Sequence, residues 1–430
     1  MPCDDTIFAL SSGAAPCAIA IIRISGTHAF AAVQQLTGRV PGARQPSLAV
    51  LRDAGGDMLD QALVTIFPGP NSATGEDLAE LHVHGGRAVI RGVQAALSAL
   101  PGLRAAQAGE FTKRAFLHGR MDLNEAEGLS DLLAAETEHQ RRAAVSMYGG
   151  AFSRAIEGWR MDLLRISALT EAELDFSDED DVDAQVGADI AGDCSALYAK
   201  MERLLAQPPA EKLRDGLRIV LGGPPNSGKS TLLNAIVNRD AAIVSDIAGT
   251  TRDVIEVPLA LDGVAMLLTD TAGVRGDSDD VIERIGIKRA EAAFAAADMI
   301  LWLGEEGSGP NHPMLIEIDA KADDPARNAK SAAASLVSAA TGLGMPKLIG
   351  QIVAQAKMLL PPADNYAINA RQRALVGSAA AAIADASCAN DWLIVGENLR
   401  VARLSLDSLT GRAHTEDLLD NIFGAFCIGK

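Results

Sequence analysis

The stretch Leu217–Leu233 reads LRIVLGGPPNSGKSTLL and carries the strongest structural signal in the second half of this chain. Its opening residues, Leu217–Leu221, have the aliphatic composition of a buried parallel strand. The segment Gly223–Ser230, GPPNSGKS, follows this strand directly, and a helical pattern begins at Thr231. A glycine-rich loop of this form between a strand and a helix is typical of proteins that bind nucleoside triphosphates. The stretch therefore predicts a phosphate site next to a parallel sheet.

Each part of this loop has a chemical reason. Glycines let backbone N–H groups turn toward the phosphates, and the amino end of the following helix adds positive potential. We expect Lys229 to neutralise the β- and γ-phosphate oxygens and the Ser230 hydroxyl to bind Mg²⁺. The other loop residues predicted to contact the nucleotide are Asn226, Ser227, Gly228 and Thr231.

Two further segments extend the predicted phosphate site. In Ile243–Asp253, IVSDIAGTTRD, Thr251 would supply a second hydroxyl to Mg²⁺ and sense the γ-phosphate. In Asp270–Gly273, DTAG, Asp270 ends a hydrophobic strand where an outer-shell carboxylate of Mg²⁺ belongs. The predicted contacts of this second segment are Asp270, Thr271, Ala272 and Gly273. No glutamine follows it, so another residue must orient the attacking water.

The base is predicted to be guanine. Where Asn-Lys-x-Asp is expected after a strand, the chain has Ala320-Lys321-Ala322-Asp323. The Asp323 carboxylate would accept hydrogen bonds from N1–H and the exocyclic amine of guanine, a pair of donors that adenine does not offer. Because Ala320 lacks the amide of asparagine, we expect weaker binding with selectivity retained. Ser338 and Ala339 begin a segment, SAATG, that is predicted to close over the base.

Composition limits the class of protein. A chain of 430 residues predicts about two to four domains. A net charge of −18 argues against a protein that coats nucleic acid non-specifically. No apolar run approaches the ~20 residues needed to span a bilayer, and the first residues lack a basic signal-peptide region. Five scattered cysteines indicate reduced thiols. We therefore expect a cytoplasmic protein without a membrane partner.

The hydrophobic pattern predicts a multidomain chain that combines α/β and all-α parts. Residues 1–120 mix strand-like runs with helices, and alanine- and leucine-rich helical periodicity begins near Leu123. After Leu217, further strand candidates, mostly with helical segments between them, indicate a doubly wound sheet. These candidates are 254–259, 265–269, 299–303, 314–318 and 335–337. We expect an α/β domain over 1–120, a helical domain from 121–212 and 358–430, and an inserted nucleotide domain over 213–357.

Both ends of the chain resemble one family. Phe426–Lys430, FCIGK, resembles the carboxy-terminal Cys-x-Gly-Lys ending of the MnmE or TrmE family of tRNA uridine-modifying GTPases, and Gly109–Phe116, GEFTKRAF, resembles its amino-domain signature. The resemblance extends over essentially the whole chain. It implies an amino-terminal domain that binds a tetrahydrofolate derivative (5-formyl- or methylene-tetrahydrofolate) and forms a homodimer, a helical domain, and an inserted Ras-like P-loop GTPase domain.

The resemblance also implies a folate site. By motif position, that site would contain Arg23, Glu80, Arg120 and Lys430. Arg120 departs from the lysine that is more frequent there, which keeps the charge but replaces an ammonium with a planar guanidinium. Cys427 has two interpretations that stay open: a thiol with a chemical role near the folate, or a small apolar side chain that packs a terminal helix.

For hydrolysis, the resemblance implies activation by K⁺ when two GTPase domains meet, with the cation in the role of an arginine finger. The implied K⁺ ligands are the Asn226 side chain and backbone oxygens of Ser245, Ile247 and Thr250. Glu283 would position the attacking water. The residues expected to act in catalysis are therefore Lys229, Thr251, Glu283 and Cys427.

The implied reaction adds an aminomethyl or carboxymethylaminomethyl group to C5 of the wobble uridine of certain tRNAs. An FAD-dependent partner of the MnmG or GidA type would take part, the folate would supply one carbon, and GTP hydrolysis would drive domain opening and closing. The alternative is a non-catalytic, nucleotide-gated assembly factor or scaffold. In that case Ala320 would mean weakened or lost switching.

Overall fold

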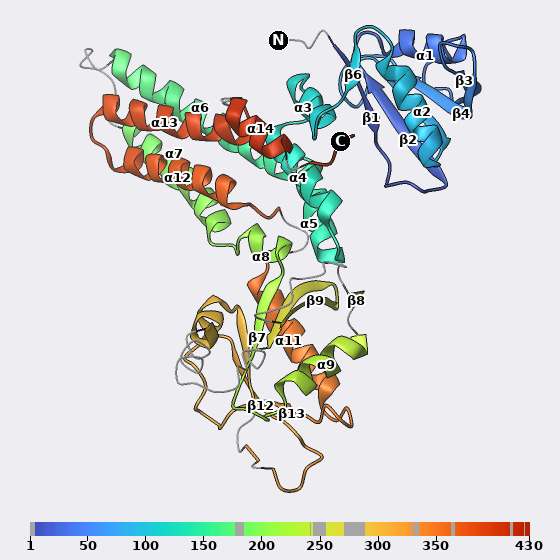
Figure 1. Ribbon diagram of the computed structural model, residues 1–430. Coiled ribbons are helices and arrows are strands. Elements are labelled where there is room, and N and C mark those ends of the chain that lie inside the picture. The colour runs from blue at the N-terminus through green and yellow to red at the C-terminus, as the bar shows by residue number, and fades with distance from the viewer. Residues whose placement is uncertain are drawn as a thin grey trace. The chain divides into compact units, whose positions relative to one another are not determined.

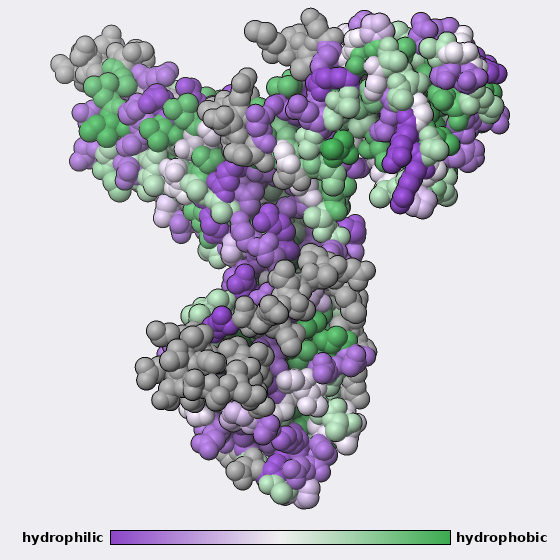
Figure 2. Space-filling model, viewed as in Figure 1, coloured by the Kyte–Doolittle hydropathy of each residue, from purple (hydrophilic) through white to green (hydrophobic). Residues whose placement is uncertain are grey.

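The computed structural model describes two compact parts of the chain (Figure 1). The first unit is Met1–Ser130 with Asp407–Lys430, and the second is Asp131–Leu406. The residues described are 5–176, 185–240, 242–243, 255–270, 289–327, 329–330, 335–362, 366–412, 416–424 and 426–430. Hydrophilic and hydrophobic residues are interspersed over the face shown in Figure 2.

The first unit is built on a six-stranded sheet in the order β3-β4-β5-β2-β1-β6. Neighbouring strands are antiparallel except β1 and β6, which are parallel. Helices α1 (Ala29–Thr37) and α2 (Arg87–Ser98) pack on one face, because alternate residues such as Ile22, Ile24 and Leu81 point into a shared apolar core. The strands are β1 Thr6–Leu10, β2 Ile19–Ser25, β3 Ser47–Arg52, β4 Met58–Phe67, β5 Leu78–His84 and β6 Leu103–Ala105.

The carboxy-terminal residues are part of the first unit. Helix α14 (Glu416–Gly424) packs against α3 (Glu110–Leu117) and the start of α4 (Leu123–Ala134), with Phe423 and Leu123 buried between them. After α14, Ile428 forms a bridge with Ala108. Gly429 has φ +97°, and a Cβ at this position would lie 2.1 Å from the carbonyl oxygen of Leu10. The tail therefore approaches β1 too closely for any residue but glycine.

The second unit contains a set of long helices. Helix α7 packs against α6 and α12, and small residues on α12, such as Ala379 and Ala380, are buried in this contact. The helices are α5 Glu138–Tyr148, α6 Ala151–Phe176, α7 Gln185–Leu205, α8 Ala210–Arg214, α12 Ala370–Cys388 and α13 Trp392–Thr410, whose last residues belong to the first unit. No helix in the described ranges is long and apolar enough to cross a membrane.

The second unit also contains a seven-stranded sheet in the order β13-β12-β11-β7-β10-β9-β8. Strands β13, β12, β11, β7 and β10 run parallel, and β9 is antiparallel to its neighbours. Five of the six residues of the central strand β7 are buried, as predicted for Leu217–Leu221. The strands are β7 Leu217–Gly222, β8 Ala242–Ile243, β9 Ile255–Leu261, β10 Val264–Asp270, β11 Met299–Trp302, β12 Leu315–Asp319 and β13 Ser335–Leu336.

The prediction of a fold that combines α/β and all-α parts is confirmed. Helix α9 (Lys229–Asp240) follows β7 and α11 (Met345–Leu359) follows β13. The expectation of helical segments between most strands is wrong at three places, the first being the two-residue turn of Asp262 and Gly263 between β9 and β10. Residues 303–314 between β11 and β12 form no helix, and neither do the described residues 320–327 and 329–330 between β12 and β13. Glycine and proline in residues 303–314, and Pro325 in the second segment, disfavour helix there.

Candidate nucleotide site and candidate folate site

The loop between β7 and α9 has the backbone of a phosphate cradle. Gly223, Asn226 and Gly228 have φ angles of +145°, +62° and +100°. A Cβ at Gly223 would lie 3.0 Å from the backbone nitrogen of Gly304, so a larger residue would not fit there. Left-handed residues in a turn let successive backbone N–H groups converge on one anion. The predicted loop thus has the conformation that a phosphate requires.

Two polar side chains of this loop lie at the predicted phosphate position. Lys229 is 5% exposed, and its Nζ donates to the carbonyl oxygens of Gly223 at 2.8 Å and Pro224 at 2.9 Å. The Ser227 Oγ is buried and has no hydrogen-bond partner among the described atoms. Because buried polar groups are normally hydrogen-bonded, this hydroxyl points to a ligand in the cradle.

Ser230 and Asp270, two of the three residues predicted to hold magnesium, meet at the mouth of the loop. Ser230, in the first turn of α9, donates its hydroxyl proton to Asp270 Oδ2 at 2.5 Å. Asp270 is the last residue of β10, which pairs in parallel with β7. A hydroxyl and a carboxylate side by side provide the hard oxygen ligands that Mg²⁺ prefers. Thr231, the next residue of the helix, is exposed at the same end.

The predicted base-binding residues lie beside this loop. Lys321 has φ +57° and donates its Nζ to the backbone oxygen of Asn226 at 2.7 Å. The exposed Asp323 accepts the hydroxyl of the buried Ser338 at 2.5 Å, and this hydrogen bond lowers the pKa of the Asp323 carboxyl. Ala320 is half-buried and packs against the core. Lys321, Asp323, Ser338 and the adjoining Ala339 therefore belong to the same corner of the sheet as the phosphate loop.

Several of the predicted site residues lie outside the residues that the structure describes. These are Ser245, Ile247, Thr250, Thr251, Thr271, Ala272, Gly273 and Glu283. The roles assigned to them stay predictions. Asn226 is the one implied potassium ligand among the described residues. It is exposed and lies in the loop between β7 and α9.

Three of the four predicted folate residues lie around Phe111 of α3. Arg23 on β2 pairs with Glu80, its register partner on β5, through contacts of 2.8 and 3.1 Å to one carboxylate oxygen. The Arg23 guanidinium carbon is 5.8 Å from the centroid of the Phe111 ring, within cation–π range. The Phe111 backbone N–H donates to the Lys430 carbonyl oxygen at 3.2 Å.

The fourth folate residue, Arg120, follows α3 and is exposed. It lies beside the loop before β5, where a Cβ at Gly75 would be 3.4 Å from its Cγ. Cys427 is also exposed, and its carbonyl oxygen accepts from Gly109 N–H at 3.4 Å and Lys430 N–H at 3.3 Å. Both interpretations of this thiol remain compatible with its position.

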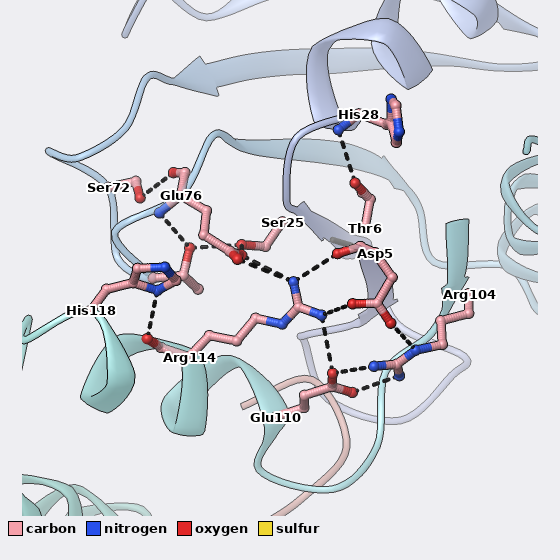
Figure 3. Close-up of polar contacts among 11 residues, drawn as sticks. Asp5, Thr6, Ser25, His28, Ser72, Glu76, Arg104, Glu110, Arg114 and His118 are labelled. Carbon is pink, nitrogen blue, oxygen red and sulfur yellow. Dashed lines mark hydrogen bonds and ion pairs between the residues drawn. The ribbon is translucent and has the colours of Figure 1, made fainter. Parts of the chain in front are cut away.

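A buried ion network next to this site was missed by the sequence analysis (Figure 3). Arg114 on α3 contacts Asp5 at 2.7 Å, Glu76 at 3.2 Å and Glu110 at 3.2 Å, and its side chain is 2% exposed. Arg104 also pairs with Glu110, at 2.5 Å. Burial raises the pKa of the Glu110 carboxyl, but hydrogen bonds, chiefly from Arg104, lower it further, so the net pKa is lowered.

The network joins four segments of the first unit: the start of β1, the loop before β5, β6 and α3. Glu76 also accepts a hydrogen bond from the Ser25 hydroxyl at 2.7 Å, at the end of β2. The only signal of this network in the sequence was Arg114, three residues after Phe111 and next to Ala115, on the helix face that becomes buried.

Comparison with known proteins relates the whole chain to one group. A family model described as "GTP-binding protein TrmE N-terminus" matches residues 6–120, and one described as "MnmE helical domain" matches residues 123–427. The chain is 54% identical over 426 residues to a protein of Erythrobacter litoralis named tRNA modification GTPase MnmE, covering 99% of this chain and 100% of the relative. Proteins of the same name from Novosphingobium aromaticivorans and Zymomonas mobilis are 53% and 48% identical, each over 99% of this chain and 100% of the relative.

Among solved structures, the G domain of the T. maritima FeoB iron transporter is 20% identical and covers 33% of this chain and 98% of that chain, with a TM-score of 0.24.

Proposed function

The chain belongs to the MnmE (TrmE) family, and from this premise we propose that it hydrolyses GTP and acts in the modification of tRNA. The main structural support for GTP hydrolysis is the 2.5 Å contact between Ser230 and Asp270, beside the buried ammonium of Lys229. This arrangement supplies oxygen ligands for Mg²⁺ and a positive charge for phosphate in one place. The exposed carboxylate of Asp323 supports guanine as the base.

In the proposed hydrolysis, Lys229 and the backbone of the phosphate loop bind and orient the β- and γ-phosphates. Mg²⁺, held by Ser230 and Thr251, would offset the charge that develops on the phosphate oxygens. Glu283 is the residue proposed to orient the attacking water. K⁺, bound by Asn226 and by backbone oxygens of Ser245, Ile247 and Thr250, is the proposed activator when two nucleotide domains meet.

The domain arrangement proposed for this function keeps the predicted boundaries. Residues 1–120 would bind the folate and form the homodimer, residues 121–212 and 358–430 would form the helical domain, and residues 213–357 the GTPase domain. Exposed apolar side chains on the sheet face opposite α1 and α2 support self-association. Leu48 on β3 and Leu63 on β4 are register partners there and are 58% and 38% exposed.

The folate proposal rests on Arg23, Glu80, Arg120 and Lys430. A carboxylate and a guanidinium beside the Phe111 ring offer acceptor, donor and aromatic contacts to a flat heterocycle that carries amide and amine groups. The folate would supply one carbon for C5 of the wobble uridine, in a complex with tRNA and an FAD-dependent partner of the MnmG or GidA type. The proposed location is the cytoplasm.

Two experiments test this function and separate it from a scaffold. Phosphate release by the full chain should be much faster in K⁺ than in Na⁺, and the difference should disappear in Asn226→Ala. Equal rates in both salts would remove the potassium mechanism. In a strain that lacks the gene, mass spectrometry of wobble nucleosides should show unmodified uridine. The wild-type chain should restore the modification, and Lys229→Ala should not. Rescue by Lys229→Ala would favour the scaffold.

A further inference from the structure

The chain after β12 folds back on the strand it has just left. Asp324 N–H donates to the Lys321 carbonyl oxygen at 2.9 Å, and Arg327 N–H donates to the Asp324 carbonyl oxygen at 3.2 Å. These two turns return the Arg327 guanidinium to Asp319, the last residue of the strand. Its Nε and one terminal nitrogen lie 3.4 and 3.5 Å from the two carboxylate oxygens. Asp323 lies in the middle of this folded loop.

The pair between Arg327 and Asp319 is largely removed from solvent. The Asp319 side chain is 7% exposed and that of Arg327 is 24% exposed. A carboxylate with so little access to water depends on a paired cation. Because the fork of a guanidinium meets both oxygens at once, the pair restricts orientation as well as supplying charge.

The described residues between β12 and β13 include no helix of the kind that usually fixes such a connection. Glu317 and Asp319, two residues apart, share one face of β12, while Ile316 and Ile318 point into the core on the other face. Lys330 pairs with Glu317, as Arg327 pairs with Asp319, and also donates to the Trp302 carbonyl oxygen at 3.1 Å. Two ion pairs thus attach the loop to the strand among the described residues of this connection.

Asp323 is therefore fixed from two sides. Ser338 holds one of its carboxylate oxygens, and Ala322 N–H donates to the Val337 carbonyl oxygen at 3.0 Å. At position 320 the methyl group of alanine forms no hydrogen bond that would restrain the loop. We propose that Arg327 is a positioning residue for guanine recognition, because its ion pair with Asp319 closes the turn that presents Asp323 to the base. This proposal rests on the proposed function, in which the site binds guanine nucleotides.

Inosine nucleotides provide the test, because hypoxanthine keeps N1–H but lacks the exocyclic amine of guanine. The ratio of the dissociation constants for IDP and GDP therefore reports how well the Asp323 carboxylate reaches both donors. We would titrate the full chain with fluorescent GDP and displace it with unlabelled GDP or IDP. For Arg327→Gln we expect the dissociation constant for GDP to rise about tenfold, as for a misaligned charge-assisted hydrogen bond, and the IDP-to-GDP ratio to fall several-fold.

Two further variants separate positioning from general support of the loop. Arg327→Lys keeps the positive charge but not the two-pronged guanidinium, so its IDP-to-GDP ratio of dissociation constants should lie between those of Arg327→Gln and wild type. Lys330→Gln breaks the neighbouring ion pair, and should leave the ratio at the wild-type value even if GDP affinity falls. If Arg327→Gln weakened GDP and IDP equally, or Lys330→Gln changed the ratio as much, the role of Arg327 would be refuted. Wild-type chain that bound no GDP would instead refute the proposed function.

Discussion

Arg114→Met removes the guanidinium that three carboxylates of the first unit share. Methionine retains much of the side-chain length and apolar contact but leaves Glu76 and Glu110, each 11% exposed, without this partner. Removing one member of a buried ion pair costs about 3–5 kcal/mol of unfolding free energy. Arg104 still pairs with Glu110, and Asp5 is 39% exposed. We therefore expect Arg114→Met to reduce the unfolding free energy of the first unit by about 3 kcal/mol, the lower end of this range.

The destabilisation caused by Arg114→Met should decrease as the pH falls. Burial raises the pKa of both Asp5 and Glu110, but their arginine partners lower it further, so both carboxyls have folded-state pKa values below their ordinary 3.8 and 4.5. Groups of this kind stabilise the folded state above their unfolded pKa and lose that contribution as the pH falls through the folded pKa. The stability difference between wild type and Arg114→Met should therefore be largest near pH 7, begin to shrink near pH 4 and vanish once the pH falls below the lowered folded-state pKa values.

Hydrogen exchange followed by mass spectrometry measures the loss of stability of the first unit in the full chain. Peptides from α3 and β5 report on the first unit, and peptides from α7 and α12 serve as an internal reference. Arg141→Met is the matched control, since its partner Glu138 is 52% exposed and the pair should not affect exchange in the first unit. Unchanged protection of α3 and β5 in Arg114→Met at pH 7 would refute the argument that the network stabilises this unit.

Three other substitutions follow from the sites. Lys229→Ala should reduce phosphate release at least a hundredfold or so while leaving the melting temperature of the nucleotide-free chain nearly unchanged, and activity within tenfold of wild type would contradict the assigned role. Gly344→Ala places a Cβ 1.9 Å from the Leu336 carbonyl oxygen at φ +73°, so it should displace the neighbouring Ser338. GDP binding measured by calorimetric titration should then be weaker, and wild-type affinity would contradict a link between Gly344 and the base site. Gly429→Ala should detach the tail from Leu10, which faster hydrogen exchange at 426–430 and weaker binding of 5-formyl-tetrahydrofolate would reveal; a protected tail would contradict it.

The sequence alone determined the features whose physics is local. A strand, a glycine loop and a helix in direct succession could be read from Leu217–Leu233, because glycine conformation and hydrophobic runs are properties of neighbouring residues. Six of the seven strands of the nucleotide sheet were located for the same reason, and the two-residue strand β8 was missed. The absence of helix between β11 and β12 was missed, although Gly307, Gly309 and Pro310 gave a local signal against one.

Which charged side chains meet depends on the tertiary structure. Arg114 and Asp5 are separated by 109 positions, and Ser230 and Asp270 by 40, so their contacts depend on how sheets and helices pack. Arg327 and Asp319 are only eight residues apart, yet no periodic pattern joins them, because two successive turns bring them together. Long-range packing and irregular turns leave no fixed spacing in a sequence. For that reason the sequence predicted the nucleotide loop, and the structure showed which charged and polar side chains meet.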